Sequence, residues 1–89
     1  MGNEREKMIT VKILFFSTIR ARIGIKELEF EIPIGSTILD LKRSLADRFP
    51  QAAPAVLNMH SAVNQVFSRD ETVIPEGAVV AFFPHVTGG

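Results

Sequence analysis

A strict alternation of apolar side chains near the start of the chain limits its fold more than any other feature. Every second residue from position 9 to 15 is large and apolar, namely Ile9, Val11, Ile13 and Phe15. This spacing predicts a β-strand with one uniformly apolar face that must be covered by a core. The residues between them begin polar, at Thr10 and Lys12, and end apolar, at Leu14 and Phe16. An apolar pair on the outer face is typical of a partner-binding surface.

A second strand with the same alternation is expected at residues 28–32. Leu28, Phe30 and Ile32 should face the core, while Glu27, Glu29 and Glu31 face the other way. We interpret the three glutamates as a solvated face opposite Thr10 and Lys12 in a hairpin, rather than as an acid–base site. Residues 17–26 are expected to form a loop that contains at most a helical turn.

One amphipathic helix should follow. Thr37 and Asp40 stand in the T-x-x-D relation of a capping box, which predicts a helix start. Spacings of three and four residues then give a single apolar stripe, made of Ile38, Leu41, Leu45 and Phe49. The charged residues between them are expected to face water, namely Lys42, Arg43, Asp47 and Arg48. Pro50 should end the helix, and one stripe can cover only one face of a sheet.

The second half of the chain has a weaker pattern. Residues 51–54 are interpreted as a connector, and a strand with undefined ends is expected within residues 56–63. Asn64-Gln65 occupies a turn position before a short extension at Val66 and Phe67. The nearly continuous apolar run 79–83 is typical of a central strand. Pro84 cannot donate a hydrogen bond to a sheet, so pairing should end there.

These elements predict an α+β fold, with a mixed sheet of about five strands and one main helix on one face. If the first and last strands are neighbours, this is the β-grasp arrangement of ubiquitin. We expect residues 1–7 to be a flexible extension, with Met8 as an alternative start. Residues 8–84 would form the β-grasp domain and residues 85–89 a C-terminal diglycine tail.

Composition argues against several functions. Ten basic and ten acidic residues cancel, so there is no electrostatic case for binding nucleic acid or an anionic membrane. The chain has no cysteine, which excludes disulfides and thiolate nucleophiles and fits a reducing compartment. We find no membrane-length apolar run and no signal peptide, and therefore expect a cytoplasmic protein. For His60 and His85, a surface or turn role is favoured over metal ligation.

The unusual reactive group is the carboxylate of Gly89, which comes directly after Gly88. Glycine has no Cβ, so such an end is thin enough to enter a narrow channel. If a partner adenylates the carboxylate, sulfur can replace oxygen and give a thiocarboxylate. A carrier without cysteine avoids disulfide exchange with this cargo. The alternative is an ordinary frayed terminus.

Three segments resemble the MoaD-type sulfur carriers of the MoaD/ThiS family, the small subunits of molybdopterin synthase. They are V-K-I-L-F-F-S-T-I-R at 11–20, A-V-N-Q at 62–65 and V-A-F-F-P-x-V-T-G-G at 80–89. The resemblance implies that an adenylyltransferase of the ubiquitin-activating type uses ATP to activate Gly89, and that no cofactor is bound permanently. It also implies insertion of the tail into the large subunit, in an expected heterotetramer, to donate sulfur to cyclic pyranopterin monophosphate.

The same resemblance assigns roles to residues. Gly88 and Gly89 match the reactive diglycine, and the partner interface would comprise Phe16, Arg20, Phe67, Phe83, Pro84, Val86 and Thr87. Core packing is the alternative for the phenylalanines, and we favour it for Phe82 but not for Phe16. An exposed arginine such as Arg20 is more often merely solvated. His85 departs from the family pattern, which usually has a second proline there.

Other functions fit the same pattern of residues. The chain is not expected to be a stand-alone enzyme, but the sulfur-donating subunit of a sulfurtransferase. Alternatives within the fold are a sulfur carrier of the thiamin pathway or a ubiquitin-like protein modifier. A ubiquitin-like interaction module with an inert tail is the alternative from a different class.

Overall fold

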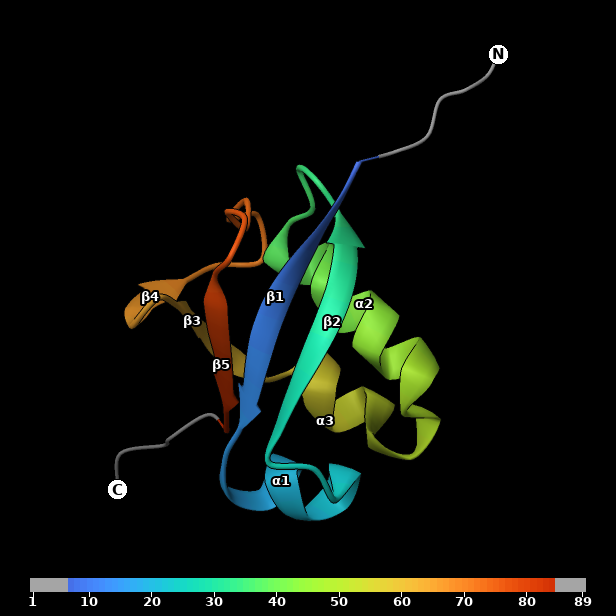
Figure 1. Ribbon diagram of the computed structural model, residues 1–89. Coiled ribbons are helices and arrows are strands. Elements are labelled where there is room, and N and C mark those ends of the chain that lie inside the picture. Colours follow the sequence, from blue (N-terminus) through green and yellow to red (C-terminus); the bar gives the residue numbers. More distant parts are fainter. Residues whose placement is uncertain (1–6, 85–89) are drawn as a thin grey trace.

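The computed structural model describes residues 7–84 of the 89-residue chain and contains a five-stranded sheet (Figure 1). The strands are β1 (Met8–Phe15), β2 (Glu27–Pro33), β3 (His60–Val63), β4 (Val66–Ser68) and β5 (Val79–Phe83). The helices are α1 (Ser17–Ile23), α2 (Ile38–Arg48) and α3 (Ala53–Leu57), and a short 3-10 helix η1 (Pro50–Ala52) lies between the last two.

The strand order is β2-β1-β5-β3-β4. β1 and β5 pair in parallel at the centre, and all other neighbouring strands are antiparallel. The first and last strands are therefore adjacent in a mixed sheet that carries its main helix on one face. This confirms the α+β, β-grasp fold that the sequence predicts.

The alternation in β1 and β2 places side chains as expected. Ile9, Val11, Ile13 and Phe15 are all buried. In β2, Leu28 and Phe30 pack against the core and the three glutamates are exposed. The hairpin register sets Thr10 opposite Glu31 and Lys12 opposite Glu29. Lys12 also lies 3.8 Å from Glu27, but an ion pair this exposed contributes little stability.

The capping box at the start of α2 is present. The Thr37 hydroxyl accepts a hydrogen bond from the Asp40 amide at 3.2 Å, and the Thr37 amide donates to Asp40 Oδ2 at 3.0 Å. The Thr37 backbone N–H, followed by the Thr37 side chain, lowers the pKa of Asp40 from its ordinary value. The apolar stripe of α2 is buried against the sheet, and the helix ends before Pro50 as predicted.

Three expectations about helices and loops were wrong. Residues 17–23 form α1 rather than a loop, because Ile19 and Ile23 are buried one turn apart and Gly24 closes the helix with a φ of 81°. Residues 50–57 form η1 and α3 rather than a connector and the start of a strand. Each of these two helices has a proline in its first turn, where the missing N–H costs nothing.

The third wrong expectation concerns Lys42, which was expected to face water but is buried in α2. By contrast, Asn64-Gln65 is the expected turn: both residues have positive φ, 50° and 71°, which suits a two-residue hairpin loop between β3 and β4. Within residues 7–84, no helix is long and apolar enough to span a membrane.

Candidate functional site

The helices cover one face of the sheet, and the other face is open. Along β5, Val80 and Phe82 point into the core, whereas Val79, Ala81 and Phe83 point away from it. The open face is apolar at its centre, because β5 alternates between two apolar sets rather than between apolar and polar residues. The outward side chains of such a strand are either covered by a partner or left as an apolar patch exposed to water.

An apolar row crosses four strands on this open face. Leu14 of β1 lies opposite Ala81 of β5, and Ala81 lies opposite Ala62 of β3. Ala62 in turn lies opposite Phe67 of β4. The row ends on the other side at Glu27, the β2 partner of Leu14. The strand register therefore builds a continuous surface that no single strand contains.

An aromatic cluster stands where β5 ends, made of His60, Phe67 and Phe83. The Phe67 and Phe83 rings meet edge to face, with centroids 5.8 Å apart. His60 lies opposite Phe83 in the ladder, and their ring centroids are 6.0 Å apart. Phe67 is 80% exposed, an unusual state for a side chain of this size. The cluster offers a partner a large, preordered apolar contact.

Phe16 forms the other side of this surface. It follows β1 directly, its amide donates a hydrogen bond to the Phe82 carbonyl at 3.3 Å, and its side chain is 46% exposed. A hollow beside it is lined by Leu14, Phe16, Asn64, Gln65, Val79 and Ala81. Asn64 ties the rim to β5, because its Oδ1 accepts from the Val79 amide at 2.9 Å. The backbone N–H of Asn64 donates to the Val79 carbonyl oxygen at 2.8 Å.

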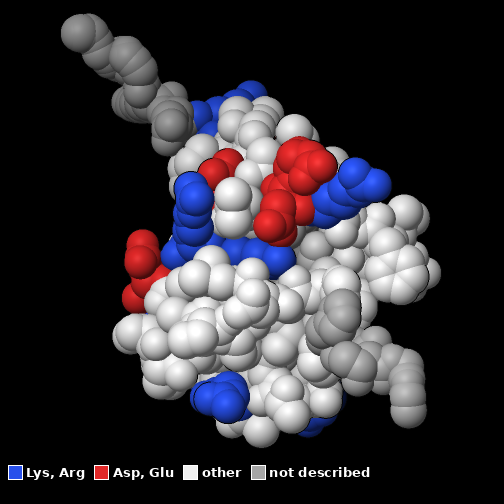
Figure 2. Space-filling model, turned by 180° about the vertical axis from the view of Figure 1, so that it is seen from behind, with Lys and Arg blue, Asp and Glu red and all other residues white. Residues whose placement is uncertain are grey.

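On the open face, exposed charged side chains of β1 and β2, namely Lys12, Glu27 and Glu29, lie beside the apolar row. Figure 2 views the molecule from behind, onto the helix-covered side, where most Lys, Arg, Asp and Glu side chains gather in the upper half and the lower half is largely uncharged. Arg20 belongs to α1, at the lower end of Figure 1, and is exposed one turn after Phe16. It lines a surface pocket with Ser17 and Lys26. Its role remains a prediction.

The structure brings together part of the predicted interface. Phe67 and Phe83 are in contact, Phe16 lies beside the end of β5, and Pro84, which follows Phe83 directly, is the last described residue. Val86, Thr87, Gly88 and Gly89 lie outside the described residues. Phe82 is 1% exposed, so it packs in the core as expected. Sequence reasoning missed His60 and Ala62, whose places on the open face depend on the register of β3.

The described part of the chain offers a binding face rather than a metal centre. Among residues 7–84, no group of three or more His, Asp or Glu side chains is placed to hold a metal ion. His60, the histidine within that range, belongs to the aromatic cluster. We therefore consider the open face, hereafter the apolar face (Leu14, Phe16, His60, Ala62, Phe67, Val79, Ala81 and Phe83), as the candidate functional site.

Comparison with known proteins gives consistent relatives. The ThiS family model matches residues 13–89. The molybdopterin synthase sulfur carrier subunit of Mycobacterium tuberculosis is 31% identical over 83 residues, covering 92% of this chain and 100% of the relative. The protein of the same name from Escherichia coli K12 is 32% identical over 81 residues, covering 89% of this chain and 99% of the relative.

Solved structures share the fold at lower identity. Small archaeal modifier protein 1 of Haloferax volcanii superposes with a TM-score of 0.79 at 15% identity, covering 88% of this chain and 99% of its own. A chain from the complex of subunits 1 and 2 of the Helicobacter pylori molybdopterin-converting factor superposes with a TM-score of 0.64 at 18% identity, covering 91% and 100%. At such identities the likeness concerns the fold.

Proposed function

The chain belongs to the ThiS family, and from this premise we propose that it is the sulfur-carrier small subunit of molybdopterin synthase. One observation carries the proposal: the central strand of the sheet runs through the apolar face and is followed, six residues after Phe83, by the terminal Gly89. In this proposal the apolar face binds the large subunit, and the residues after Pro84 reach into that subunit. The relatives from M. tuberculosis and E. coli support this choice, because they bear this name and match over nearly their whole length.

The reaction begins at the Gly89 carboxylate, which is a poor electrophile at neutral pH. A carboxylate oxygen attacks the α-phosphorus of ATP, which forms an acyl adenylate and releases pyrophosphate. A sulfur nucleophile at the oxidation level of sulfide then attacks the carbonyl carbon, and AMP leaves with the electron pair of the broken C–O bond. The product is a terminal thiocarboxylate, with sulfur in place of one oxygen.

The thiocarboxylate sulfur then attacks an oxygen-bearing carbon of cyclic pyranopterin monophosphate, so that a C–S bond forms and the C–O bond at that carbon breaks, with its electron pair leaving on the oxygen. Water cleaves the remaining bond between this sulfur and the Gly89 carbonyl carbon, so that the carboxylate is restored and the sulfur stays on the pterin. A dithiolene holds a pair of sulfur atoms, and each carrier brings a single one. Two sulfur-loaded carriers are therefore consumed for each pterin.

We assign the pterin-handling groups to the large subunit and the docking role to this chain. The apolar face suits that role, since an aromatic cluster and a neighbouring hollow are features of interface centres. A protein of this fold has been solved in complex with the second subunit of a molybdopterin-converting factor, which supports the pairing. The adenylyltransferase must reach the same Gly89, so the two partners should compete for the chain.

A second sulfur-transfer pathway or protein modification would use the same terminal chemistry. The likeness to small archaeal modifier protein 1 concerns the fold alone and does not favour that function. Isopeptide-linked conjugates of this chain in cell extract would support a modifier. Their absence, together with copurification of a large subunit, would support the sulfur carrier.

Deletion of Gly89 tests the proposal. The shortened chain should still bind the large subunit with near-normal affinity, because Phe16, Phe67 and Phe83 are unchanged. It should support no molybdopterin formation in a reconstituted mixture of large subunit, adenylyltransferase, ATP, sulfur source and cyclic pyranopterin monophosphate. The full chain is the matched control. Product formation by the shortened chain at the normal rate would contradict the proposed carrier role.

A further inference from the structure

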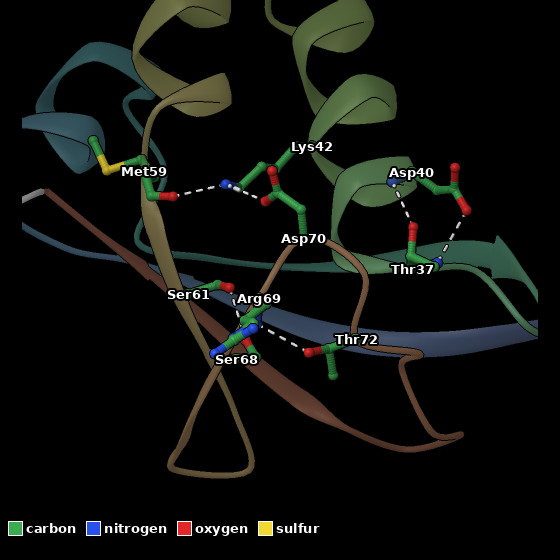
Figure 3. Close-up of polar contacts among 9 residues, drawn as sticks. All are labelled: Thr37, Asp40, Lys42, Met59, Ser61, Ser68, Arg69, Asp70 and Thr72. Carbon is green, nitrogen blue, oxygen red and sulfur yellow. Dashed lines mark hydrogen bonds and ion pairs between the residues drawn. The ribbon is translucent and has the colours of Figure 1, made fainter.

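Lys42 of α2 is buried although it carries a charge. The residue is 5% exposed, and its Nζ donates hydrogen bonds to the Met59 carbonyl oxygen at 2.7 Å and to Asp70 Oδ1 at 2.8 Å (Figure 3). Removing an ammonium group from water is costly even when it is paired. An apolar side chain would extend the buried stripe of α2 without that cost. The role of the ammonium group therefore follows from the two groups to which it donates hydrogen bonds.

The two acceptors of Lys42 mark the two ends of one hairpin. Met59 directly precedes β3, and Asp70 lies two residues after β4 ends. The Asp70 carbonyl also accepts a hydrogen bond from the Leu39 amide, at the start of the same helix, at 2.9 Å. Lys42 and the first turn of α2 thus fasten both ends of the β3–β4 hairpin to the main helix.

The hairpin needs such an anchor. β4 is a strand of three residues at the edge of the sheet, and among residues 7–84 its one partner strand is β3. On its core side, a hydrogen bond of 2.7 Å joins the Ser61 and Ser68 hydroxyls (Figure 3). On the outer side of the hairpin lie His60 of β3 and Phe67 of β4, whose contacts with Phe83 of β5 form the aromatic cluster. A shift of the hairpin relative to β5 would separate these rings.

We propose that Lys42 is a positioning residue for the partner-binding face: by joining Met59 and Asp70 to α2, it sets the β3–β4 hairpin so that Phe67 meets the large subunit. The inference rests on the proposed function, which makes the apolar face the large-subunit interface. Lys42 lies on the helix-covered side of the sheet and acts through the hairpin, not by touching the partner.

The variant Lys42→Met removes the ammonium and keeps most of the apolar stem. Its Kd for the large subunit should rise about tenfold, as expected when an interface anchor loses its position. Amide hydrogen exchange should accelerate in residues 60–68 and remain near normal in β1 and β2. The matched control is Ile32→Val, which loosens the core at β2, on the opposite edge of the sheet from β4, and leaves the Lys42 contacts intact. It should lower the melting temperature and change Kd by less than about twofold.

A double-mutant cycle with Phe67→Ala separates positioning from general destabilisation. If Lys42 acts through Phe67, adding Lys42→Met to Phe67→Ala should cause little further loss of affinity, so the two effects will not add. Additive effects would overturn the proposal, as would a Kd for Lys42→Met within about twofold of the wild-type value. Asp70→Ala serves if Lys42→Met fails to fold: it breaks one of the two bonds at a half-exposed residue, and it should give a smaller loss with the same non-additivity.

Failure of the proposed function looks different. If the wild-type chain does not bind the large subunit, the sulfur-carrier proposal fails, and the partner-binding part of this inference falls with it. If the wild type binds and Lys42→Met binds equally well, the sulfur-carrier proposal stands and the positioning role is wrong. Uniform acceleration of hydrogen exchange over the whole sheet would likewise contradict a role confined to the hairpin.

Discussion

Replacing Phe67 by alanine should separate partner binding from folding. The side chain is 80% exposed, so its removal takes little apolar area out of the folded core. The substitution chiefly abolishes the edge-to-face pair with Phe83, and such pairs contribute about 0.5–1.5 kcal/mol. The free energy of unfolding should therefore fall by no more than about 1.5 kcal/mol. Phe82 gives the opposite case: at 1% exposure, its replacement by alanine should cost about 3–5 kcal/mol.

The effect of Phe67→Ala on binding should be larger than its effect on stability. Exposed aromatic residues that become central in an interface typically contribute about 2 kcal/mol or more, which corresponds to a rise in Kd of about 30-fold. Urea denaturation would measure the free energy of unfolding, and titration calorimetry with the large subunit would measure Kd. Both measurements use the full-length chain.

Leu57→Ala is the matched control for this experiment. Leu57 is 42% exposed on α3, on the helix-covered side of the sheet, so its truncation removes a similar kind of side chain from a different surface. Its Kd should stay near the wild-type value. Near-normal binding by Phe67→Ala, or equal losses in the two variants, would refute the assignment of the apolar face to the partner.

Three other substitutions test neighbouring contacts. Phe16→Asp should leave the fold intact, as judged by circular dichroism, and weaken large-subunit binding in calorimetry, because it charges the apolar face without opening the core; loss of folding would show that Phe16 is a core residue. Asn64→Ala should lower the free energy of unfolding by about 2 kcal/mol in urea, since it removes the bond to the Val79 amide and strains a residue with positive φ; an unchanged midpoint would contradict this. Asp40→Asn should be less stable than the wild type at neutral pH. The folded-state pKa of Asp40 is lowered below 3.8, so its stabilisation is present above that value and is lost as the pH falls through the folded-state pKa. Urea midpoints of the two proteins should therefore converge in acid, and a gap that persists there would be inconsistent with a charge effect.

The elements that the sequence predicted well have long or doubly marked patterns. β1 and β2 repeat their alternation over several residues, and α2 combines a capping box with a three-turn stripe. α1 and α3 have seven and five residues, which is too short for a period of 3.6 to be recognised. Pro50 and Pro54, in the first turns of η1 and α3, resemble breaks when only the sequence is considered, although proline is equally suited to a first helical turn.

Lys42 shows why a pattern on one helix can mislead. Its acceptors lie 17 and 28 residues further along the chain, so nothing within the helix marks the position as buried. The candidate site has a similar limit. The outward direction of Phe16 follows from parity in one strand, but the row from Leu14 to Phe67 requires the register of four strands. The roles of Val86, Thr87, Gly88 and Gly89 stay predictions, because these residues lie outside the described range.

The mass of the chain after activation tests the central claim most directly. The full-length protein would be incubated with the adenylyltransferase, ATP and a sulfur source, and its intact mass and C-terminal fragments measured. The sulfur-carrier account predicts a gain equal to the difference between sulfur and oxygen, located at Gly89 and absent without ATP. An unchanged mass with an active adenylyltransferase, or a gain located at another residue, would contradict it.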